Sequence, residues 1–418
     1  MAERADIFRS AGPAYRQTFE RRMPPSHVRA MEDIVFCRTP ALGGSIYACD
    51  DCGHLDYSYH SCRNRHCPKC QQDRAQAGLA KLRARLLPCD HYLLTFTLPG
   101  PLRAVARAHQ RAVYDILLRE AAASVQTLAH DPKWLGGRPA ILAVLHTWSR
   151  TLAYHPHAHL LVSAGGLTPD GGAWRKPAHR RFLVPGYALS QVFRAKMRDA
   201  LSRADLAEDI KANVWNAAWA VHVQQIGSGQ HAALYLSRYV YRVALSNERI
   251  EAFARDSVTF RYTHARTRET RRMTLPAQDF IARFLQHVLP RGFSKIRYYG
   301  LVSPSAGKNL ERARQLLLSA AASTNSRKAE ESDPQRALSA ACASAGVHRH
   351  GSVPHAEPVS SASSGPRTDR EHLHDARYAG DPAPPASEQA LRLARRLCRA
   401  LSTSTPQSRD QATGRRNA

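Results

Sequence analysis

The sequence lacks long apolar runs. No stretch among its 418 residues approaches the roughly 20 consecutive apolar residues of a membrane-spanning helix, and the N-terminus, MAERADIFRS, has no apolar signal core. We therefore expect a cytoplasmic protein with no membrane partner. A G-x4-G-K-[ST] phosphate loop is also missing, because AGKN at 306–309 lacks the upstream glycine and the hydroxyl. The chain therefore contains no recognisable nucleotide-driven motor.

Acidic residues are scarce beside basic ones. The chain has 34 Asp+Glu against 60 Lys+Arg, for a formal net charge of +26. So large an excess indicates a polyanionic partner, with nucleic acid as the first candidate. Residues 321–418 carry 14 Lys+Arg and 10 Asp+Glu, so most of the excess lies in the first 320 residues. The nucleic-acid-binding surface is expected there.

Cysteine is also scarce, and most of it is clustered. Six of the nine cysteines lie between Cys37 and Cys70, which favours a metal site over a disulfide framework. Two CxxC pairs at the ends of CDDCGHLDYSYHSCRNRHCPKC predict one closed, structural zinc site made by Cys49, Cys52, Cys67 and Cys70. Further candidate ligands, including those of a second site, are Cys62, His66, Cys37 and His54. The interleaved Arg63, Arg65 and Lys69 predict a cationic surface for DNA phosphates.

Composition divides the chain into three parts. Residues 1–88 hold the cysteine cluster, and residues 89–318 alternate apolar runs with helical patterns, as in a mixed α+β domain. Residues 319–418 are rich in Ser, Ala, Pro and Arg without periodicity. Such a composition cannot bury enough apolar surface to offset chain ordering, so a largely disordered tail is expected.

Three short runs predict strands: HYLLTFTLP (91–99), ILAVLHTW (141–148) and HLLVSAG (159–165). Just before the third, YHPHAHLLV (154–162) places His155, His157 and His159 at alternate positions. Residues two apart on a strand project from one face, roughly 6.5–7 Å apart, so His157 and His159 can converge on one divalent ion. We expect Mg²⁺ or Mn²⁺, although imidazole also suits zinc and magnesium prefers oxygen ligands, so the sequence does not choose.

A predicted helix, GQHAALYLSRYVYRVALSN (229–247), supplies candidate nucleophiles. Tyr235 and Tyr239 are four residues apart and share a face, while Arg238 and Arg242 are placed to hold a phosphate. A phenol is a weak nucleophile at neutral pH unless a nearby ion stabilises the charge that leaves. Tyrosine and histidines together predict cleavage of a phosphodiester through a covalent 5′-phosphotyrosine, and two tyrosines allow two successive transfers.

Four segments together resemble the rolling-circle transposases of the insertion sequence 91 family. They are CRNRHCPKC (62–70), LHTWSRTLAYHPHAHLLVSAGGL (145–167), YLSRYVYRVALSN (235–247) and FLQHVLPRGFSKIRYYG (284–300). The resemblance spans roughly residues 15–318 in matching order. Two departures are the small Ala158 between the histidines and the tail after about residue 320, which matches no part of the family.

The resemblance implies a zinc-binding domain followed by a histidine–hydrophobic–histidine (HUH) endonuclease with a central antiparallel sheet flanked by helices. It also implies that His157 and His159 form the metal pair and that Tyr235 and Tyr239 are the nucleophiles. Its members nick one strand at an element's end and move it as single-stranded DNA. The implied partners are single-stranded DNA at transposon ends and target DNA, and we expect a bacterial cytoplasmic protein associated with the nucleoid. Because no motor is encoded, strand displacement is expected to need a host helicase.

Several alternatives stay open at this point. The third metal ligand is His231 in the first instance, with His155 and His146 as competitors. A plasmid replication initiator or relaxase would share the fold and chemistry. A non-enzymatic zinc-containing DNA-binding regulator would explain the charge and the cysteines, but would leave the histidines and tyrosines without a role. No motif recommends a transposase built on three carboxylates.

Overall fold

The computed structural model describes residues 2–179, 182–208, 210–227, Ala232, Val240 and 243–331. Its centre is a five-stranded sheet in the order β12-β4-β5-β3-β8, and every neighbouring pair is antiparallel. The strands are β3 (His91–Thr97), β4 (Ala140–Trp148), β5 (Tyr154–Ser163), β8 (Val221–Gly227) and β12 (Ile296–Gly300). The predicted mixed fold around a central antiparallel sheet is confirmed.

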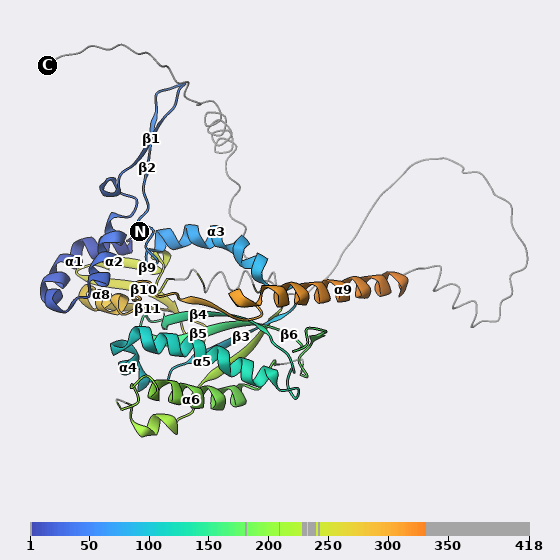
Figure 1. Cartoon of the computed structure of the whole chain (residues 1–418). Coiled ribbons are helices and arrows are strands. Elements are labelled where there is room, and N and C mark those ends of the chain that lie inside the picture. Colours follow the sequence, from blue (N-terminus) through green and yellow to red (C-terminus); the bar gives the residue numbers. More distant parts are fainter. Residues whose placement is uncertain are drawn as a thin grey trace, which may run out of the picture. The chain divides into compact units, whose positions relative to one another are not determined.

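One face of this sheet is covered by helices. The helices are α4 (Leu102–Ala108), α5 (Gln110–His130) and α6 (Gly186–Ser202), which lie below the strands in Figure 1. Because side chains alternate along a strand, Ile141, Ala143 and Leu145 of β4 point into this layer, as do Leu160 and Val162 of β5. Together they form the largest hydrophobic core of the molecule.

The opposite face of the sheet carries the intervening residues. Leu142, Val144 and Leu161 form a smaller buried cluster there with Ala232 and Val240. Further along the same strands, the same alternation turns His146, His157 and His159 to this face. One face is therefore dedicated to packing, and the other combines packing with histidines.

The N-terminal segment packs beside the sheet through a second core. It comprises α1 (Arg4–Phe19), α2 (Pro25–Phe36), β1 (Gly44–Ala48), β2 (Leu55–Tyr59) and α3 (Pro68–Arg85). Phe8 of α1 meets Phe284 of α8 (Ala277–Leu285), with ring centroids 5.2 Å apart. Residues on both sides of the predicted boundary at 88 thus share one hydrophobic cluster. That boundary stays a prediction.

A three-stranded antiparallel sheet completes this second core. Its order is β11-β10-β9, with β9 (Ile250–Ala254), β10 (Ser257–Thr263) and β11 (Thr270–Pro276). Val258 and Phe260 of β10 are fully buried, and Phe260 meets Phe280 of α8 with ring centroids 6.2 Å apart. The end of β10 reaches the edge of the histidine face, as described below.

The remaining elements are short, apart from one long helix. That helix, α9 (Gly307–Glu331), runs past residue 318, where the tail was expected to begin, and the expected disorder of 332–418 lies outside the described residues. The others are β6 (Gly166–Leu167), β7 (Trp174–Arg175), η1 (Glu20–Arg22), η2 (Pro40–Leu42), η3 (Ala212–Trp215), η4 (Asn247–Arg249) and η5 (Pro304–Ala306). Within the part of the chain that the structure describes, no helix is long and apolar enough to cross a membrane.

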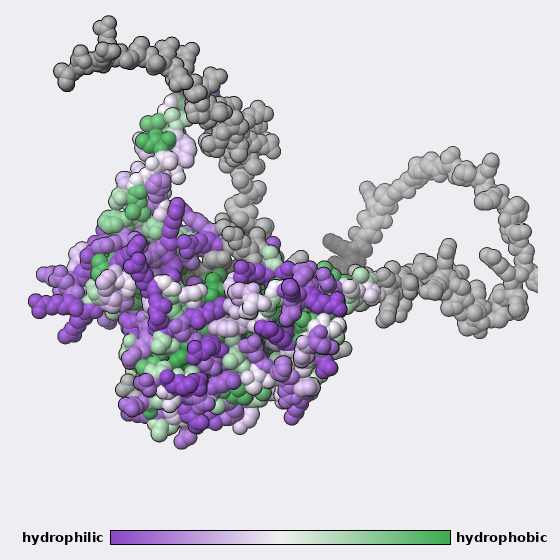
Figure 2. All heavy atoms as spheres, viewed as in Figure 1, coloured by the Kyte–Doolittle hydropathy of each residue, from purple (hydrophilic) through white to green (hydrophobic). Residues whose placement is uncertain are grey.

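The β1–β2 hairpin projects from the second core (Figure 1). All ten of its strand residues are exposed. Its register places Ile46 opposite Tyr57 and Ala48 opposite Leu55 on one face. Figure 2 shows hydrophobic side chains along this arm, whereas the adjoining surface is mostly hydrophilic. The hairpin is therefore held together by the hydrogen bonds between β1 and β2 and by the residues at its base and its tip.

Candidate active site and metal centre

Three histidines of the central sheet meet at one point. The register pairs His146 of β4 with His157 of β5, and Val144 with His159. One ring nitrogen from each of the three histidines lies within 4.8 Å of the others. The Nε2 atoms of His157 and His159 are 3.1 Å apart, close to the spacing of two nitrogens about 2 Å from one metal ion. The arrangement therefore fits one divalent cation.

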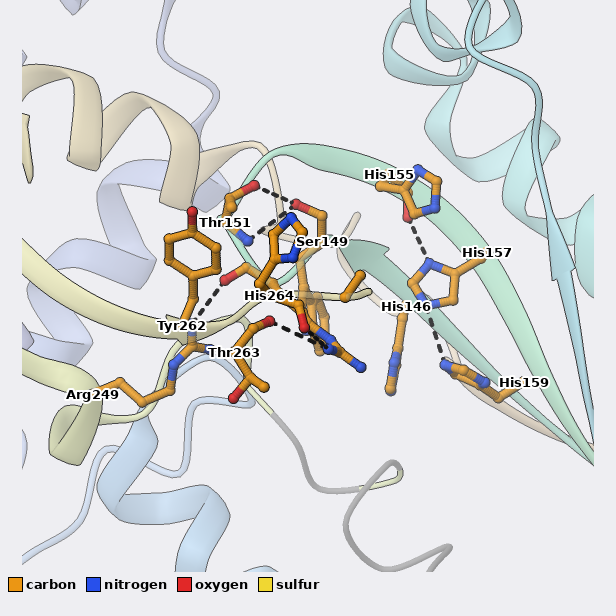
Figure 3. A pocket seen from close by; sticks show the side chains of 13 residues that line it. His146, Ser149, Thr151, His155, His157, His159, Arg249, Tyr262, Thr263 and His264 are labelled. Carbon is orange, nitrogen blue, oxygen red and sulfur yellow. Dashed lines mark hydrogen bonds between the residues drawn. The ribbon is translucent and has the colours of Figure 1, made fainter. Parts of the chain in front are cut away.

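The other nitrogens of two of these rings are hydrogen-bonded away from this point. His157 Nδ1 is 2.7 Å from the carbonyl oxygen of His155, and since a carbonyl can only accept, Nδ1 carries the proton (Figure 3). His159 Nδ1 is 3.0 Å from the Thr95 hydroxyl of β3. Metal-binding histidines commonly hold their second nitrogen in this way, which fixes the tautomer and presents Nε2 to the ion. The local hydrogen bonds thus suit metal binding.

His146 is the buried member of the set. Its side chain is only 2% exposed, and its ring stacks on Trp148 with centroids 4.6 Å apart and planes at 20°. It meets His157 and His159 edge-on, at centroid distances of 5.5 and 4.8 Å. Trp148 therefore supports the ring that completes the histidine triad, defined here as His146, His157 and His159.

His155 lies outside this triad. Its Nδ1 is 2.9 Å from Arg103 of α4, which can only donate. Burial, and then the charge of Arg103, lowers the pKa of His155, so its ring is neutral at physiological pH. Of the predicted alternatives for the third ligand, the structure brings His146 to the pair and turns His155 toward an arginine, while His231 lies outside the described residues.

The triad opens into a pocket of about 430 Å³. The pocket is also lined by Arg150 of the β4–β5 turn, by Arg249 of η4, and by residues at the end of β10 and just after it. Figure 3 shows Arg249, Tyr262, Thr263 and His264 across from the triad. Arg150 donates to the carbonyl oxygens of Thr263 and His264, both at 3.3 Å, which ties the turn to the three-stranded sheet. Among the described residues that line this pocket, none is a carboxylate. The wall is thus cationic and hydroxyl-bearing, as a phosphodiester would require.

The candidate nucleophiles Tyr235 and Tyr239 lie outside the described residues, as do Arg238 and Arg242. Two neighbours in sequence are described. Ala232 and Val240 are helical and buried, and both pack on Leu142, Val144 and Leu161. Those three residues share the sheet face of the histidine triad. Ala232 and Val240 therefore lie on the sheet face that carries the histidine triad.

A second metal-binding group joins Cys37, Cys62, Cys67 and Cys70, whose sulfurs all lie within 4.8 Å of one another. The Cys37–Cys70 and Cys62–Cys70 sulfur distances are both 3.6 Å, near the roughly 3.8 Å expected for two thiolates on one tetrahedral zinc ion. Backbone N–H groups of Cys62 and Asn64 donate to the Cys37 and Cys62 sulfurs at 3.5 Å. This four-cysteine centre has the closed form of structural zinc.

The four-cysteine centre corrects the predicted ligand set. Cys67 and Cys70 belong to it, but Cys49 and Cys52 do not, and the candidate Cys62 and the spare Cys37 take their places. Cys49 and Cys52 lie at the far end of the β1–β2 hairpin, five residue pairs from the base pair Gly44–Tyr59. Five strand residues span about 17 Å. A single ion cannot bridge that distance.

The protonation of the four thiols also favours a cation. Burial raises the pKa of Cys37 to about 11, and a hydrogen bond to Cys67 together with burial raises the pKa of Cys62 further. A hydrogen bond from Cys62 lowers the pKa of Cys67 to about 5. Cys37, Cys62 and Cys67 therefore compete for protons, and a bound cation would let these thiols ionise together.

The loop between Cys62 and Cys70 attaches this centre to the rest of the protein. Arg65, half-buried, donates to the carbonyl oxygen of Phe293, and His66 Nε2 accepts from the backbone N–H of Leu289 at 3.3 Å. His66 is therefore not a member of the four-cysteine centre. Lys69 pairs with Glu3 at 2.7 Å. Of the residues predicted to contact DNA in this loop, Arg63 is exposed, whereas Arg65 and Lys69 are half-buried and have partners within the protein. All three stay predicted DNA contacts.

Sequence reasoning assigned no role to two buried residues at this junction. Arg4, fully buried, donates to the carbonyl oxygen of His66 at 3.1 Å and lies 4.6 Å above the ring of Phe284. His287 lies 3.2 Å from both the Thr147 hydroxyl and the Leu152 carbonyl oxygen, beside the strand of His146. Both residues join the cysteine region to the histidine sheet, and only the contact between distant segments reveals them.

Comparison with known proteins divides the chain between the same two regions. Residues 7–98 match a family described as "Transposase zinc-binding domain", and residues 140–309 match one described as "Putative transposase". The first holds the four-cysteine centre and the second holds the histidine triad. No solved structure matches the chain.

Two relatives cover most of the chain. One is "Putative transposase y4qJ" of Sinorhizobium fredii (strain NBRC 101917 / NGR234), 39% identical over 72% of this chain and 80% of the relative. Another is "Transposase for insertion sequence element IS801" of Pseudomonas savastanoi pv. phaseolicola, 31% identical over 66% of this chain and 70% of the relative. The chain is a transposase with an N-terminal zinc-binding domain, and hence an enzyme that acts on DNA. It belongs to the insertion sequence 91 family, as the four sequence segments indicated.

Proposed function

We propose that this transposase nicks and rejoins single-stranded DNA at the ends of its element through a covalent 5′-phosphotyrosine. The observation that carries the proposal is the histidine triad, whose nitrogens converge within 4.8 Å at the mouth of a cationic pocket. A divalent ion held there would polarise the scissile phosphate and stabilise the leaving oxygen. This is the chemistry of an HUH-type endonuclease in rolling-circle transposition.

The protein's own groups would carry out the bond changes. A tyrosine oxygen attacks phosphorus and the bond from phosphorus to the 3′ oxygen breaks, which leaves a free 3′ hydroxyl and a 5′-phosphotyrosine. The phenolic proton leaves the nucleophile as that bond forms, and a proton is taken up by the departing 3′ oxygen. Rejoining reverses the step with a different 3′ hydroxyl. Phosphodiester bond energy is kept throughout, so no nucleotide is consumed.

The buried positions of Ala232 and Val240 support tyrosine as the nucleophile. At the helical spacing predicted for this segment, Tyr239 lies within about 20° of Ala232 around the helix axis, and Tyr235 within about 60°. Both phenols would then flank the stripe that packs on the histidine face. Tyr241 would point about 180° from Ala232, away from the sheet.

The two tyrosines would serve two successive transfers. We expect Tyr239→Phe to remove most of the covalent adduct, and Tyr235→Phe to permit one cleavage while blocking the second transfer. Complete transposition would fail with either change. Tyr241→Phe serves as the matched control, and its adduct yield should equal that of the unchanged protein.

The pocket wall supports a single DNA strand as the substrate. Arg150, Arg249 and Thr263 line the same pocket as the triad, and the two guanidinium groups also donate to backbone carbonyls that hold them in place. Arginine binds phosphate oxygens well, and a single strand is the substrate that the family resemblance implies. Since the sequence has no phosphate loop for a motor, a host helicase would supply the displaced strand, both at the element's ends and at the target.

His146 is the third metal ligand in this proposal. His146→Ala should weaken binding of Mn²⁺, measured by titration calorimetry, at least as much as His157→Ala, whereas His155→Ala should leave it nearly unchanged. Equal losses for His146→Ala and His155→Ala would show that the burial and stacking of His146 do not mark it as a ligand.

The test of the proposed function is a denaturing gel. The protein is incubated with labelled single-stranded DNA from the flanks of its own gene, with Mn²⁺, Mg²⁺ or chelator. A labelled band that migrates with the protein, requires the metal and disappears in the Tyr235→Phe/Tyr239→Phe double variant is the expected result. Cleavage that leaves no covalent adduct, or an adduct on duplex DNA alone, would contradict the proposal.

A further inference from the structure

The tip of the β1–β2 hairpin is a cysteine pair that the four-cysteine centre leaves unused. Cys49 and Cys52 are both exposed. A single turn connects them, closed by hydrogen bonds from Gly53 N–H to the Cys49 carbonyl at 2.8 Å and from Cys49 N–H to the His54 carbonyl at 2.9 Å. Gly53 adopts a φ of +67°, which favours glycine there.

The turn keeps Cys49 and Cys52 together, because only two residues separate them and its backbone hydrogen bonds close it. A CxxC turn lets two thiolates reach one ion. Two metal-binding sulfurs are thus held together without any ion from the four-cysteine centre.

The hairpin register supplies further ligands on the same face. Continuing the pairs Tyr47–Asp56 and Ala48–Leu55 places His54 directly opposite Cys49. Opposite residues of an antiparallel pair have Cβ atoms about 5 Å apart, within reach of an imidazole. Asp56 lies two residues beyond His54, so its carboxylate projects from this face too.

We propose that the hairpin tip is a second zinc site, separate from the four-cysteine centre, with Cys49, Cys52 and His54 as ligands and Asp56 completing the four. These side chains would close on the ion as it binds, since among the described residues only the four-cysteine centre and the histidine triad bring three or more ligand atoms within 4.8 Å of one another. Two thiolates with an imidazole select zinc over magnesium or calcium. The local charge agrees, because residues 44–60 carry three acidic side chains and no lysine or arginine in a chain of net charge +26.

The hairpin itself has a structural need for this ion. An isolated two-stranded hairpin is marginally stable in water, and all ten strand residues of this one are exposed. The four-cysteine centre anchors its base, since Cys37 precedes β1 and Cys62 follows β2. A zinc ion at Cys49 and Cys52 would anchor the tip, so that both ends of the ladder are closed.

The test counts zinc in the full-length chain, in a His157→Ala/His159→Ala background so that the histidine triad contributes none. Elemental analysis should give two zinc ions per chain, falling to one in Cys49→Ser/Cys52→Ser and in His54→Ala, and staying at two in the control Cys89→Ala. Hydrogen exchange at the β1 and β2 amides should accelerate in Cys49→Ser/Cys52→Ser, with α1 and α8 unchanged.

Three results would overturn the proposal. One zinc per chain in the background protein would mean that the tip binds none. Loss of all zinc in Cys49→Ser/Cys52→Ser would mean that the two CxxC pairs share one site. A ratio of 1.5 in a dimer would mean that two tips share an ion without His54. These measurements use no DNA, so their outcome does not depend on the proposed function.

Discussion

The two clusters of metal-binding side chains differ in what surrounds them. The four-cysteine centre is enclosed, with Cys37, Cys67 and Cys70 all at most 3% exposed, and its ligands come from a loop and from helix ends. The histidine triad lies on neighbouring strands of a rigid sheet and faces a pocket of about 430 Å³. A closed thiolate site holds segments together, whereas an open imidazole site leaves room for a substrate. We propose that the four-cysteine centre serves folding and that the histidine triad serves chemistry.

Removing a triad histidine is the strongest way to probe this separation. His157→Ala or His159→Ala should lower DNA cleavage by about 10³-fold, because charge stabilisation by a metal ion is worth several kcal/mol. Affinity for single-stranded DNA should change little, since many Lys and Arg neutralise phosphates. Single-turnover cleavage and fluorescence anisotropy measure the two quantities, and excess Mn²⁺ should partly restore the single variants.

The matched control for that experiment is His222→Ala. His222 is an exposed histidine on β8, on the same sheet face, paired with Thr95 and outside the triad. If its loss slows cleavage as much as the loss of His157, the triad has no special role. Full activity in His157→Ala/His159→Ala would contradict the comparison outright.

Breaking the four-cysteine centre should have the opposite effect, lowering stability while leaving the cleavage rate of the folded protein nearly unchanged. Cys70→Ser should release one zinc ion and lower the free energy of unfolding by several kcal/mol, since structural zinc in small domains contributes on the order of 10 kcal/mol of apparent binding free energy. The protein that stays folded should cleave at a rate close to normal. Zinc analysis, urea unfolding and cleavage normalised to folded protein check this, with Cys89→Ala as control. Unchanged stability in Cys70→Ser would show that the four-cysteine centre has no structural role.

Acid should weaken the junction between the two regions. Burial lowers the pKa of His287 to about 4, below its ordinary value of 6.5. In this pH range the unfolded chain binds a proton at His287 and the folded chain does not. The free energy of unfolding therefore decreases as the pH falls from about 6.5 toward 4. At pH 5 the loss is about 2 kcal/mol from this residue. Urea unfolding at pH 7.5 and 5.0 should show a smaller difference in His287→Gln, and an unchanged difference would rule His287 out.

The smallest effect concerns the hydroxyl behind the triad. Thr95 lies 3.0 Å from His159 Nδ1, so Thr95→Val keeps the shape and removes the hydrogen bond. Partners of this kind are worth about 10-fold in metal affinity. A Mn²⁺ titration should show that loss for Thr95→Val and none for Thr97→Val on the same strand. Equal Mn²⁺ affinities of the unchanged protein, Thr95→Val and Thr97→Val would mean that the Thr95 hydrogen bond does not orient the His159 ring.

Local pattern was sufficient for some of this structure. Short apolar runs rich in β-forming residues predicted β3, β4 and β5, and the histidine alternation placed His157 and His159 on one face. Proline at 156 suggested a less regular strand, yet β5 includes it from Tyr154 onward. The carbonyl of Pro156 still accepts from Leu98 N–H at 3.2 Å, so the strand continues through a residue that only lacks a donor.

Contacts between distant segments could not be predicted in this way. His146 joins the triad through the register of β4 on β5, and a strand's sequence does not state its register. The two CxxC pairs looked like one site because spacing says which ligands are near along the chain and not which loops meet. Cys37 reaches the four-cysteine centre because α2 ends beside the base of the hairpin. The partner of Arg65, the carbonyl oxygen of Phe293, is likewise 228 residues away in the sequence.

The central claim is that the histidine face and the segment anchored by Ala232 and Val240 form one active site. The most direct test is mass spectrometry of the peptide that remains attached to DNA after cleavage and proteolysis. The account predicts a nucleotide adduct on Tyr239 or Tyr235, absent when His157 is replaced by alanine. An adduct on Tyr241, or on any residue outside 229–247, would contradict it.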